Sequence, residues 1–380
     1  MITQSAPLMF GAGCLKSLGE QMKRHGLKKA LIVTDKGITA AGVTDKVAAV
    51  IKDAGGECVI YDECLPDPPH TSIPKPAAIA NEEAVDFIIG LGGGSCMDTA
   101  KAAAVVIKNP KPATEFIMKP PAQPDVPVIL IPTTSGTGSE VTSVGVISDA
   151  DTFEKFGVVI TGALLAIVDP ELTVGLPPHI TAMTGMDVVA HAVEAITGKM
   201  RNPMSDLRGY EALRLVAENL PAAVRDGSNI DAREGMSFAS TLAGMAFNDS
   251  ITTLGHSIAQ ALSKTTHLPH GQLCGLATPP EVALFATVLP EKVRKIGVIF
   301  GADIPADATP EEIGKLSADK IREFMSEVGL SSFEKLGYSR EDILGKIEDV
   351  MADRMKVFSP LEITREIAVQ VLNEMCDYKG

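Results

Sequence analysis

The hydrophobic pattern of the chain changes once, close to Leu176–Pro178. Before this point, short apolar runs such as Ala30–Thr34 and Val126–Ile131 alternate with amphipathic stretches, which predicts a mostly parallel sheet covered on both faces by helices. After it, Ala- and Leu-rich segments of helical period follow one another. Those segments are 182–196, 206–218, 232–247, 254–263, 280–289 and 361–376. We therefore expect an α/β domain over residues 1–178 and an all-helical domain over residues 179–380.

Composition narrows the class of protein. The chain has 380 residues and a net charge of −14, so basic side chains are too few for a nucleic-acid groove or an anionic membrane surface. No apolar run reaches the ~18 residues of a membrane span, and the N-terminus carries no secretory signal pattern. The six cysteines are scattered, and we interpret them as small buried side chains in a reducing compartment. We expect a cytoplasmic protein without a nucleic-acid or membrane partner.

A carboxylate and an imidazole stand one helical turn apart in the second half. Asp187 and His191 are i and i+4 in the segment TGMDVVAHAVEA, so a helix places both side chains on one face. On that face they can converge on one cation. An ordinary surface Asp–His pair has the same spacing, and the two residues alone do not separate these interpretations.

Two further histidines follow in the same half. His256 lies in an Ala-rich helical segment, and His270 stands at a Pro-His-Gly break. Each is also compatible with a hydrogen-bonded core residue. One carboxylate and three imidazoles form a donor set that suits Fe(II), Zn(II) or a similar first-row ion. The spacing leaves open whether Asp187 and His191 meet the later pair in space.

A glycine-rich loop follows the apolar run Phe87–Ile89. Gly92, Gly93, Gly94 and Ser95 lie between this predicted strand and a predicted helix, where backbone N–H groups can hold a diphosphate. A plain glycine turn fits the same letters, with Asp98 compensating the helix dipole. A Walker A loop is excluded, because no Gly-Lys-Ser/Thr follows at the required spacing.

Polar residues end two other predicted strands. Asp35 follows the first strand, where a carboxylate can accept hydrogen bonds from an adenosine ribose, although turn residues at such places are common. Thr133, Thr134 and Thr137 follow the strand of Val126–Ile131. Because open parallel sheets bind ligands at the carboxyl ends of their strands, these groups together favour nucleotide binding.

Four motifs, in this order and spacing, resemble the iron-containing, group III alcohol dehydrogenases. They are GGGSCMDTAK (92–101), PTTSGTGSEVT (132–142), TGMDVVAHAVEA (184–195) and GHSIAQAL…LPHG (255–271). The resemblance extends from about Pro7 to beyond Glu281. It implies an α/β N-terminal dinucleotide-binding domain followed by an all-helical C-terminal metal-binding domain, the dehydroquinate synthase-like fold.

The resemblance also implies roles for individual residues. The family's metal ligands fall on Asp187, His191, His256 and His270. Its cofactor-binding residues fall on Asp35, Gly92, Gly93, Gly94, Ser95, Asp98, Thr133, Thr134, Thr137, Thr142, Lys155 and Leu172. The aspartate at 35 is typical of members that use NAD, since a carboxylate repels a 2′-phosphate. The expected cofactors are NAD(H) and one divalent metal, with Fe(II) as the first expectation and Zn(II) as the second.

Two positions depart from the family's pattern. Many relatives carry a proton-relaying histidine four residues after the one at 256, and this chain has Gln260 there. Because glutamine does not titrate near neutral pH, the relay must use water, the cofactor ribose or a residue such as His267. The candidate catalytic residues are therefore His256, His267 and His270. The family's Pro-Asn-Pro turn is Pro66–Pro68 here, with Asp67 adding negative charge near the adenosine.

The sequence thus predicts a metal-dependent NAD(H) alcohol dehydrogenase or aldehyde reductase. Hydride transfer would link a small primary alcohol or diol with nicotinamide. The alternatives are a glycerol-type polyol dehydrogenase, a dehydroquinate-synthase-like lyase and a non-catalytic nucleotide- or metal-binding relative. The resemblance also implies a homodimer or a larger homo-oligomer.

Overall fold

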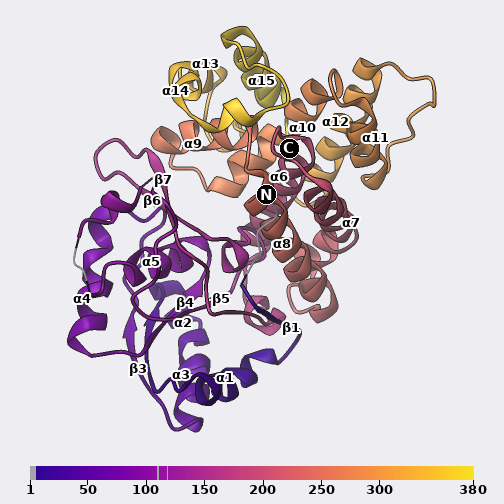
Figure 1. The fold of residues 1–380 in the computed structure, drawn as a ribbon. Coiled ribbons are helices and arrows are strands. Elements are labelled where there is room, and N and C mark those ends of the chain that lie inside the picture. The colour runs from indigo at the N-terminus through magenta and orange to yellow at the C-terminus, as the bar shows by residue number, and fades with distance from the viewer. Residues whose placement is uncertain (1–5, 109–110, 118) are drawn as a thin grey trace. The chain divides into compact units, whose positions relative to one another are not determined.

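The computed structural model describes residues 6–108, 111–117 and 119–380. The chain divides into two compact units, with the division between Gly175 and Leu176. The first unit contains a sheet with helices, and the described residues of the second unit contain helices without strands (Figure 1). The predicted fold class, an α/β unit followed by an all-helical unit, is confirmed.

Six parallel strands form the main sheet of the first unit, in the order β1-β8-β5-β4-β2-β3. Their bounds are β1 Leu8–Phe10, β2 Lys29–Val33, β3 Glu57–Tyr61, β4 Phe87–Gly92, β5 Val128–Pro132 and β8 Leu165–Val168. β4 is central and buried along its whole length. The glycine loop therefore follows a strand in the middle of the sheet, where its carboxyl end has strands on both sides.

Both faces of the sheet are covered. Leu31 and Val33 of β2 pack into one hydrophobic cluster with α4 and α5, and Ala30 and Ile32 pack into another with α1 and α3. Alternate residues of a strand point to opposite faces, which explains this division. The helices of this unit are α1 Leu18–His25, α2 Lys36–Ala40, α3 Val43–Asp53, α4 Pro74–Glu82 and α5 Gly94–Ala104.

A two-stranded antiparallel hairpin joins β5 to β8. Its strands are β6, Val144–Ser148, and β7, Lys155–Val159. Before it, Ser139–Val141 form a short 3-10 helix, η4. Gly145 of β6 lies against α5, because a Cβ added there would be 3.0 Å from the carbonyl oxygen of Asp98. This contact ties the hairpin to the helix that follows the glycine loop.

The second unit packs its helices around α6 and α10. α6 is buried along most of its length, and it contacts α7, α8 and α10. The bounds are α6 Pro178–Thr197, α7 Pro203–Arg225, α8 Ile230–Ser250, α9 Leu254–Thr266, α10 His270–Ala286, α11 Pro290–Ile299, α12 Pro310–Glu327, α13 Arg340–Leu344, α14 Ile347–Ala352 and α15 Arg365–Asp377.

One predicted helix is wrong in its bounds. The segment 280–289 was expected to begin a helix at Pro280, but α10 begins at His270 and runs through Pro279 and Pro280. Proline normally interrupts a helix because it lacks an N–H and crowds the preceding turn. Here the buried packing of α10 outweighs that local preference.

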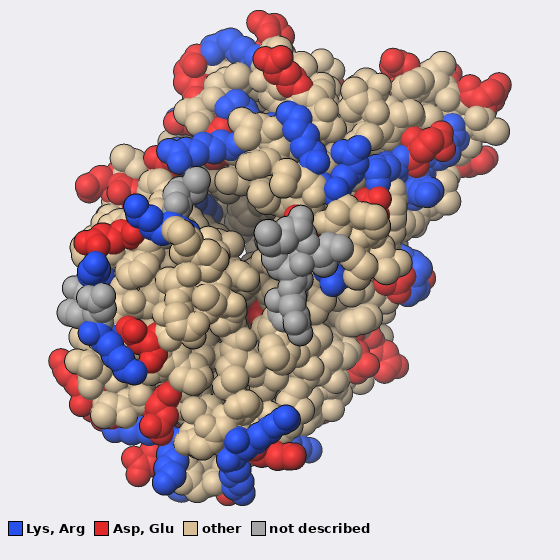
Figure 2. Space-filling model, viewed as in Figure 1, with Lys and Arg blue, Asp and Glu red and all other residues tan. Residues whose placement is uncertain are grey.

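Among the described residues, no helix is both long and apolar enough to cross a bilayer. On the face drawn in Figure 2, basic and acidic side chains are interspersed on the surface. The acidic excess of the sequence is therefore not gathered into one patch on that face.

Candidate metal and nucleotide sites

α6 supplies a buried carboxylate and a buried imidazole to the helical unit. Asp187 is 3% exposed and His191 is 5% exposed, so they are not a surface pair. Oδ2 of Asp187 lies 3.9 Å from Nδ1 of His191. The ring of His191 stacks on Phe247 of α8, with centroids 4.2 Å apart. Burial of both groups in a helix of mostly apolar neighbours needs a compensating partner.

α9 and α10 bring the other two histidines to the same place. His256 is in the first turn of α9, and its ring centroid is 4.6 Å from that of His191. His270 is the first residue of α10, with its ring centroid 5.1 Å from that of His256. Nε2 of His270 lies 3.9 Å from Oδ1 of Asp187. The two arrangements that the sequence left separate therefore meet in space.

The chain turns sharply between these histidines. α9 ends with His267 as its C-cap, in the left-handed conformation at φ 53°, and Pro269 precedes α10. His267 is exposed. A Cβ added at Gly271 would lie 2.4 Å from the carbonyl oxygen of Met183, so α10 begins in direct contact with the backbone of α6. Glycine at this position lets His270 approach Asp187.

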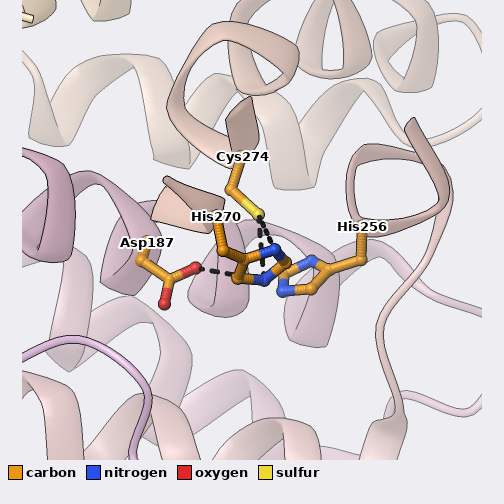
Figure 3. Close-up of side chains that lie close together, drawn as sticks. All are labelled: Asp187, His256, His270 and Cys274. Carbon is orange, nitrogen blue, oxygen red and sulfur yellow. Dashed lines mark hydrogen bonds and ion pairs between the residues drawn. The ribbon is translucent and has the colours of Figure 1, made fainter. Parts of the chain in front are cut away.

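Cys274 lies beside His270 and was missed by the sequence analysis. Its Sγ is 3.4 Å from Nε2 of His270, which is one turn earlier in α10. Asp187, His256, His270 and Cys274 each offer a donor atom within 4.8 Å of the others' (Figure 3). His191 flanks this group through its contacts with Asp187 and His256. The i,i+4 spacing from His270 was the signal available in the sequence, but we interpreted the cysteines as buried hydrophobic residues.

Two buried glutamates hold the start of α9. Glu194 of α6 accepts hydrogen bonds from the backbone N–H groups of Thr253 and His256, and its Oε1 is 2.8 Å from Nδ1 of His256. Glu281 of α10 accepts from the N–H of Gly255 and from the hydroxyl of Thr253. A Cβ added at Gly255 would lie 2.5 Å from Oε1 of Glu194 and 2.8 Å from Oε2 of Glu281. Glu194 therefore orients the imidazole of His256, and Glu281 holds the backbone at the start of α9. Neither glutamate was predicted as a site residue.

The pKa values of these acids follow from their surroundings. Burial raises the pKa of Asp187, but the imidazoles of His191, His270 and His256 lower it by a larger amount. The pKa of Asp187 therefore lies below its ordinary value. Burial raises the pKa of Glu194 to about 8. Burial and the neighbouring Glu194 raise the pKa of Glu281 well above its ordinary value. Asp187 is therefore held as the anion, and the two glutamates share one polar pocket in which a proton is retained.

The donor set fits a divalent metal ion. Oδ1 of Asp187 has no hydrogen-bond partner among the described residues, although it is buried and ionised. A buried carboxylate oxygen in this condition is costly unless a cation or a donor compensates it. The imidazoles of His256 and His270 and the thiol of Cys274 lie around this carboxylate, and the imidazole of His191 lies 3.9 Å from its other oxygen, Oδ2. Oxygen and nitrogen donors of this kind suit first-row divalent ions.

A cleft of about 850 Å³ lies in the α/β unit at the carboxyl ends of β2, β3, β4 and β5. Six of the twelve predicted cofactor residues line it. They are Asp35, Gly93, Gly94, Ser95, Thr133 and Thr134. Asp35 is the N-cap of α2, and its Oδ1 accepts a hydrogen bond from the N–H of Ile38 at 3.0 Å. The cleft therefore combines a carboxylate, hydroxyls and the glycine loop, as a nucleotide site requires.

The glycines of the loop serve different purposes. Gly92 has φ 145°, and a Cβ there would lie 2.7 Å from Sγ of Cys96. A Cβ at Gly94 would lie 2.9 Å from Cγ2 of Thr137. Gly93 has ordinary extended backbone angles, and the nearest atom to an added Cβ is 3.5 Å away. Close contacts therefore require glycine at 92 and 94, but not at 93. The lack of a side chain at 93 leaves the N-terminus of α5 open to the cleft.

The other six predicted cofactor residues are not part of the cleft lining. They are Gly92, Asp98, Thr137, Thr142, Lys155 and Leu172. Asp98 accepts a hydrogen bond from the hydroxyl of Ser139 at 2.6 Å and pairs with the fully buried Lys101. Thr142 accepts from the same lysine, and Leu172 is buried in the 3-10 helix η5, Pro170–Thr173. Asp98 and Lys101 thus join α5 to η4 beneath the loop.

Lys155 and Asp67 form an ion pair in the same unit. Nζ of Lys155 lies 2.7 Å from Oδ1 of Asp67, and the lysine side chain is mostly buried. Asp67 is in the left-handed region at φ 45°, and its carbonyl oxygen accepts a hydrogen bond from Ser148. The aspartate that replaces the family's asparagine therefore partly neutralises the lysine that the resemblance assigns to the cofactor.

Comparison with known proteins decides the family. A sequence model of the iron-containing alcohol dehydrogenases matches residues 6–170, and a model of the C-terminal part of the same family matches residues 181–376. The chain belongs to the iron-containing alcohol dehydrogenase family. The predicted resemblance is confirmed, and the chain is an enzyme of the oxidoreductase class.

Curated members of the family align with nearly the whole chain. A choline dehydrogenase of Bacillus subtilis is 34% identical over 94% of this chain and 90% of its own length. An NAD-dependent methanol dehydrogenase of Bacillus methanolicus is 34% identical over 96% of both chains. A 1,3-propanediol dehydrogenase of Klebsiella pneumoniae is 35% identical over 90% of each.

Solved structures of the family have the same fold. A 1,3-propanediol oxidoreductase is 31% identical, with a TM-score of 0.91 over 99% of this chain and 100% of its own. A sulfoacetaldehyde reductase from Bifidobacterium kashiwanohense, solved in complex with NAD+, is 29% identical, with a TM-score of 0.86 over 99% of this chain and 98% of its own. The fold assignment therefore extends over both units.

Proposed function

We propose that the protein is a metal-dependent NAD(H) alcohol dehydrogenase that also runs as an aldehyde reductase. The observation that carries this proposal is the convergence of Asp187, His256 and His270 from three helices around a buried carboxylate oxygen. The glycine-loop cleft of the α/β unit supports the nucleotide half of the proposal. The domain roles follow, with residues 1–178 binding the nucleotide and residues 179–380 binding the metal and the substrate.

Asp187, His191, His256 and His270 are the proposed metal-binding residues, with Fe(II) as the first expectation and Zn(II) as the second. A divalent cation supplies a Lewis acid to an alcohol or carbonyl oxygen, and nicotinamide supplies the hydride acceptor or donor. Asp187 contributes the negative charge of the set, because its pKa lies below its ordinary value. Glu194 fixes the ring of His256 by accepting at Nδ1, which directs Nε2 toward Asp187 and His270.

The cleft residues support NAD as the cofactor. Gly93–Ser95 form the N-terminus of α5 and line the cleft, where their N–H groups would hold a diphosphate. Asp35 places a carboxylate on the cleft wall, suited to the hydroxyls of an adenosine ribose and repulsive to a 2′-phosphate. Asp98, Thr142 and Lys155 then act by holding the loop and its hairpin in place, whereas Leu172 packs in the hydrophobic core on one face of the sheet.

Proton transfer must proceed without the family's second histidine. Gln260 lies in α9 one turn after His256, and its amide neither takes nor releases a proton near neutral pH. His256 and His270 orient the substrate oxygen in this proposal. His267 is proposed as the proton carrier because it is exposed at the C-cap of α9 and can exchange with solvent.

The substrate class is a small polar alcohol or its aldehyde. The relatives are named for choline, methanol, 1,3-propanediol and sulfoacetaldehyde, which all carry a primary alcohol or an aldehyde on a short chain. We propose the cytoplasm as the location, from the acidic composition and the scattered cysteines, and a homodimer or larger homo-oligomer from the family resemblance. Light scattering on the purified protein tests the oligomeric state.

A reconstitution assay tests the proposal. The purified enzyme is stripped with a chelator, reloaded separately with Fe(II) and Zn(II), and assayed by the absorbance of NADH with a panel of short alcohols, diols and aldehydes. We expect turnover to disappear on stripping and to return with metal. The same panel run with NADP tests Asp35, with NAD as the expected better cofactor. Undiminished turnover of the stripped enzyme would refute metal dependence.

A further inference from the structure

Cys274 faces the proposed metal site from the same helix face as His270. The two residues are one turn apart in α10, and Figure 3 shows both side chains directed toward Asp187 and His256. Cys274 is fully buried. Its Sγ is 3.4 Å from Nε2 and 3.9 Å from Nδ1 of His270.

The packing of α10 on α6 holds this thiol in place. A Cβ at Gly271 would meet the carbonyl oxygen of Met183 at 2.4 Å, and one at Gly275 would meet Cβ of Met186 at 2.9 Å. Glycines one turn apart therefore allow the two helices to touch on either side of Cys274.

The distances between the donor atoms are close to, or longer than, those between ligands of one ion. Bond lengths of about 2.3 Å to sulfur and about 2.05 Å to nitrogen or oxygen give tetrahedral edges of about 3.5 Å and about 3.3 Å. The distance of 3.4 Å from Sγ of Cys274 to Nε2 of His270 is close to the sulfur–nitrogen edge of about 3.5 Å. The distance of 3.9 Å from Nε2 of His270 to Oδ1 of Asp187 is longer than the nitrogen–oxygen edge of about 3.3 Å. All four donor atoms lie within 4.8 Å of one another. The most widely separated donors must therefore approach one another by up to about 1.5 Å when the ion binds.

A second observation points independently to a cation here. Oδ1 of Asp187, buried and without a hydrogen-bond partner among the described residues, belongs to the same four-donor group. One divalent ion shared by the surrounding donors would compensate the charge of this oxygen.

We propose that Cys274 is a metal ligand of this enzyme in addition to Asp187, His191, His256 and His270, which raises the affinity of the site for Zn(II) relative to Fe(II). The inference rests on the proposed metal dependence and adds a thiolate to the expected oxygen and nitrogen donors. Binding breaks the S–H bond, the proton passes to solvent, and the sulfur lone pair enters the coordination shell without any change of oxidation state. Thiolate ligands favour zinc relative to sites made of oxygen and imidazole alone.

Cobalt(II) substitution tests this proposal on the complete protein. The enzyme is stripped and reloaded with Co(II), and its absorption spectrum is recorded for sulfur-to-cobalt charge transfer. The wild type is expected to bind one cobalt per chain and to show this band. Cys274→Ser should lose the band and bind Zn(II) at least about tenfold more weakly, with a lower Zn(II)-to-Fe(II) ratio when both ions compete. Cys376→Ser, at a half-buried thiol of α15, should retain the wild-type spectrum.

The outcomes separate this inference from the proposed function. Wild-type protein that binds cobalt and regains turnover without a sulfur band refutes the Cys274 ligand and leaves metal dependence intact. Protein that takes up no cobalt and turns over without metal refutes both. The wild-type spectrum decides the first question by itself, so the result does not depend on whether Cys274→Ser folds.

Discussion

Gly93 is not required by the packing of the fold, unlike the glycines on either side of it. Its neighbours at 92 and 94 are required by close contacts with Cys96 and Thr137, whereas an alanine Cβ at 93 meets nothing closer than 3.5 Å. The backbone angles at 93 are also available to any residue. The remaining reason for glycine there is the approach of another molecule to the backbone.

Gly93→Ala should therefore weaken nucleotide binding with little loss of stability. We expect Kd for NAD to rise about tenfold, or about 1.4 kcal/mol, while stability falls by less than about 1 kcal/mol. Gly94→Ala is the contrasting variant, because its Cβ would be 2.9 Å from Thr137 and overpacking costs about 1–3 kcal/mol. Calorimetric titration with NAD and thermal unfolding measure the two effects. Unchanged NAD affinity in Gly93→Ala would remove the diphosphate assignment.

Glu281 gives the protein a pH dependence of known sign. Its pKa is raised well above 4.5 by burial and by Glu194, so the folded chain keeps a proton that the unfolded chain releases from about pH 5 upward. Stability from this group is complete below the unfolded pKa and is lost as pH rises toward the folded pKa. The slope is about 1.4 kcal/mol per pH unit while one proton is retained.

Glu281→Gln, which mimics the protonated acid, should remove that slope. The thermal midpoint of the variant should rise relative to the wild type as the buffer changes from about pH 5 to about pH 8. Glu311→Gln, at an exposed glutamate of α12, should show no growing difference. A constant difference between Glu281→Gln and the wild type over this range would show that Glu281 is ionised in the folded state.

At the scale of elements, the contact of α10 with α6 sets the geometry of the helical site. Gly271→Ala would place a Cβ 2.4 Å from the carbonyl oxygen of Met183 and 3.2 Å from Cβ of Asp187. Because backbone cannot give way as a side chain does, α10 must move and carry His270 with it. We expect a loss of about 1–3 kcal/mol in stability and a lower metal content by elemental analysis. Gly175→Ala has open space around its Cβ and should change neither.

The sequence predicted most elements because their periodicity is local. The alternation of strands and helices and the helical period after Leu176 were enough for the fold class. Strand order was not predictable in this way, since β1 at residues 8–10 pairs with β8 at residues 165–168. The course of α10 through Pro279 and Pro280 was also missed, because tertiary packing there outweighs the local preference.

Some residues of the candidate site were predictable from the sequence and others were not, for the same reason. Asp187, His191, His256 and His270 were predicted because their side chains are of the types that bind metals, and the structure brings them together. Cys274 was missed because a lone cysteine in an apolar segment is usually a hydrophobic residue. Glu194 and Glu281 were missed because their role depends on the first turn of a different helix, α9. The sequence shows which side chains can bind a metal, but the packing of α6, α9 and α10 determines which of them lie close together.

At the scale of the whole molecule, the family assignment covers both units, and each unit has its own hydrophobic core. The α/β unit holds the glycine-loop cleft, and the helical unit holds the buried donors. We propose that one divalent metal held at Asp187 is indispensable to the NAD-dependent reaction.

The most direct test is the paired measurement of metal content and NADH turnover in Asp187→Asn. We expect both to fall together, by more than the ~10–100-fold that loss of a ligand's hydrogen-bonding neighbour causes. Asp231→Asn, at an exposed aspartate of α8, should match the wild type in both. An Asp187→Asn enzyme that is free of metal and turns over NADH at the wild-type rate would show that the metal is dispensable.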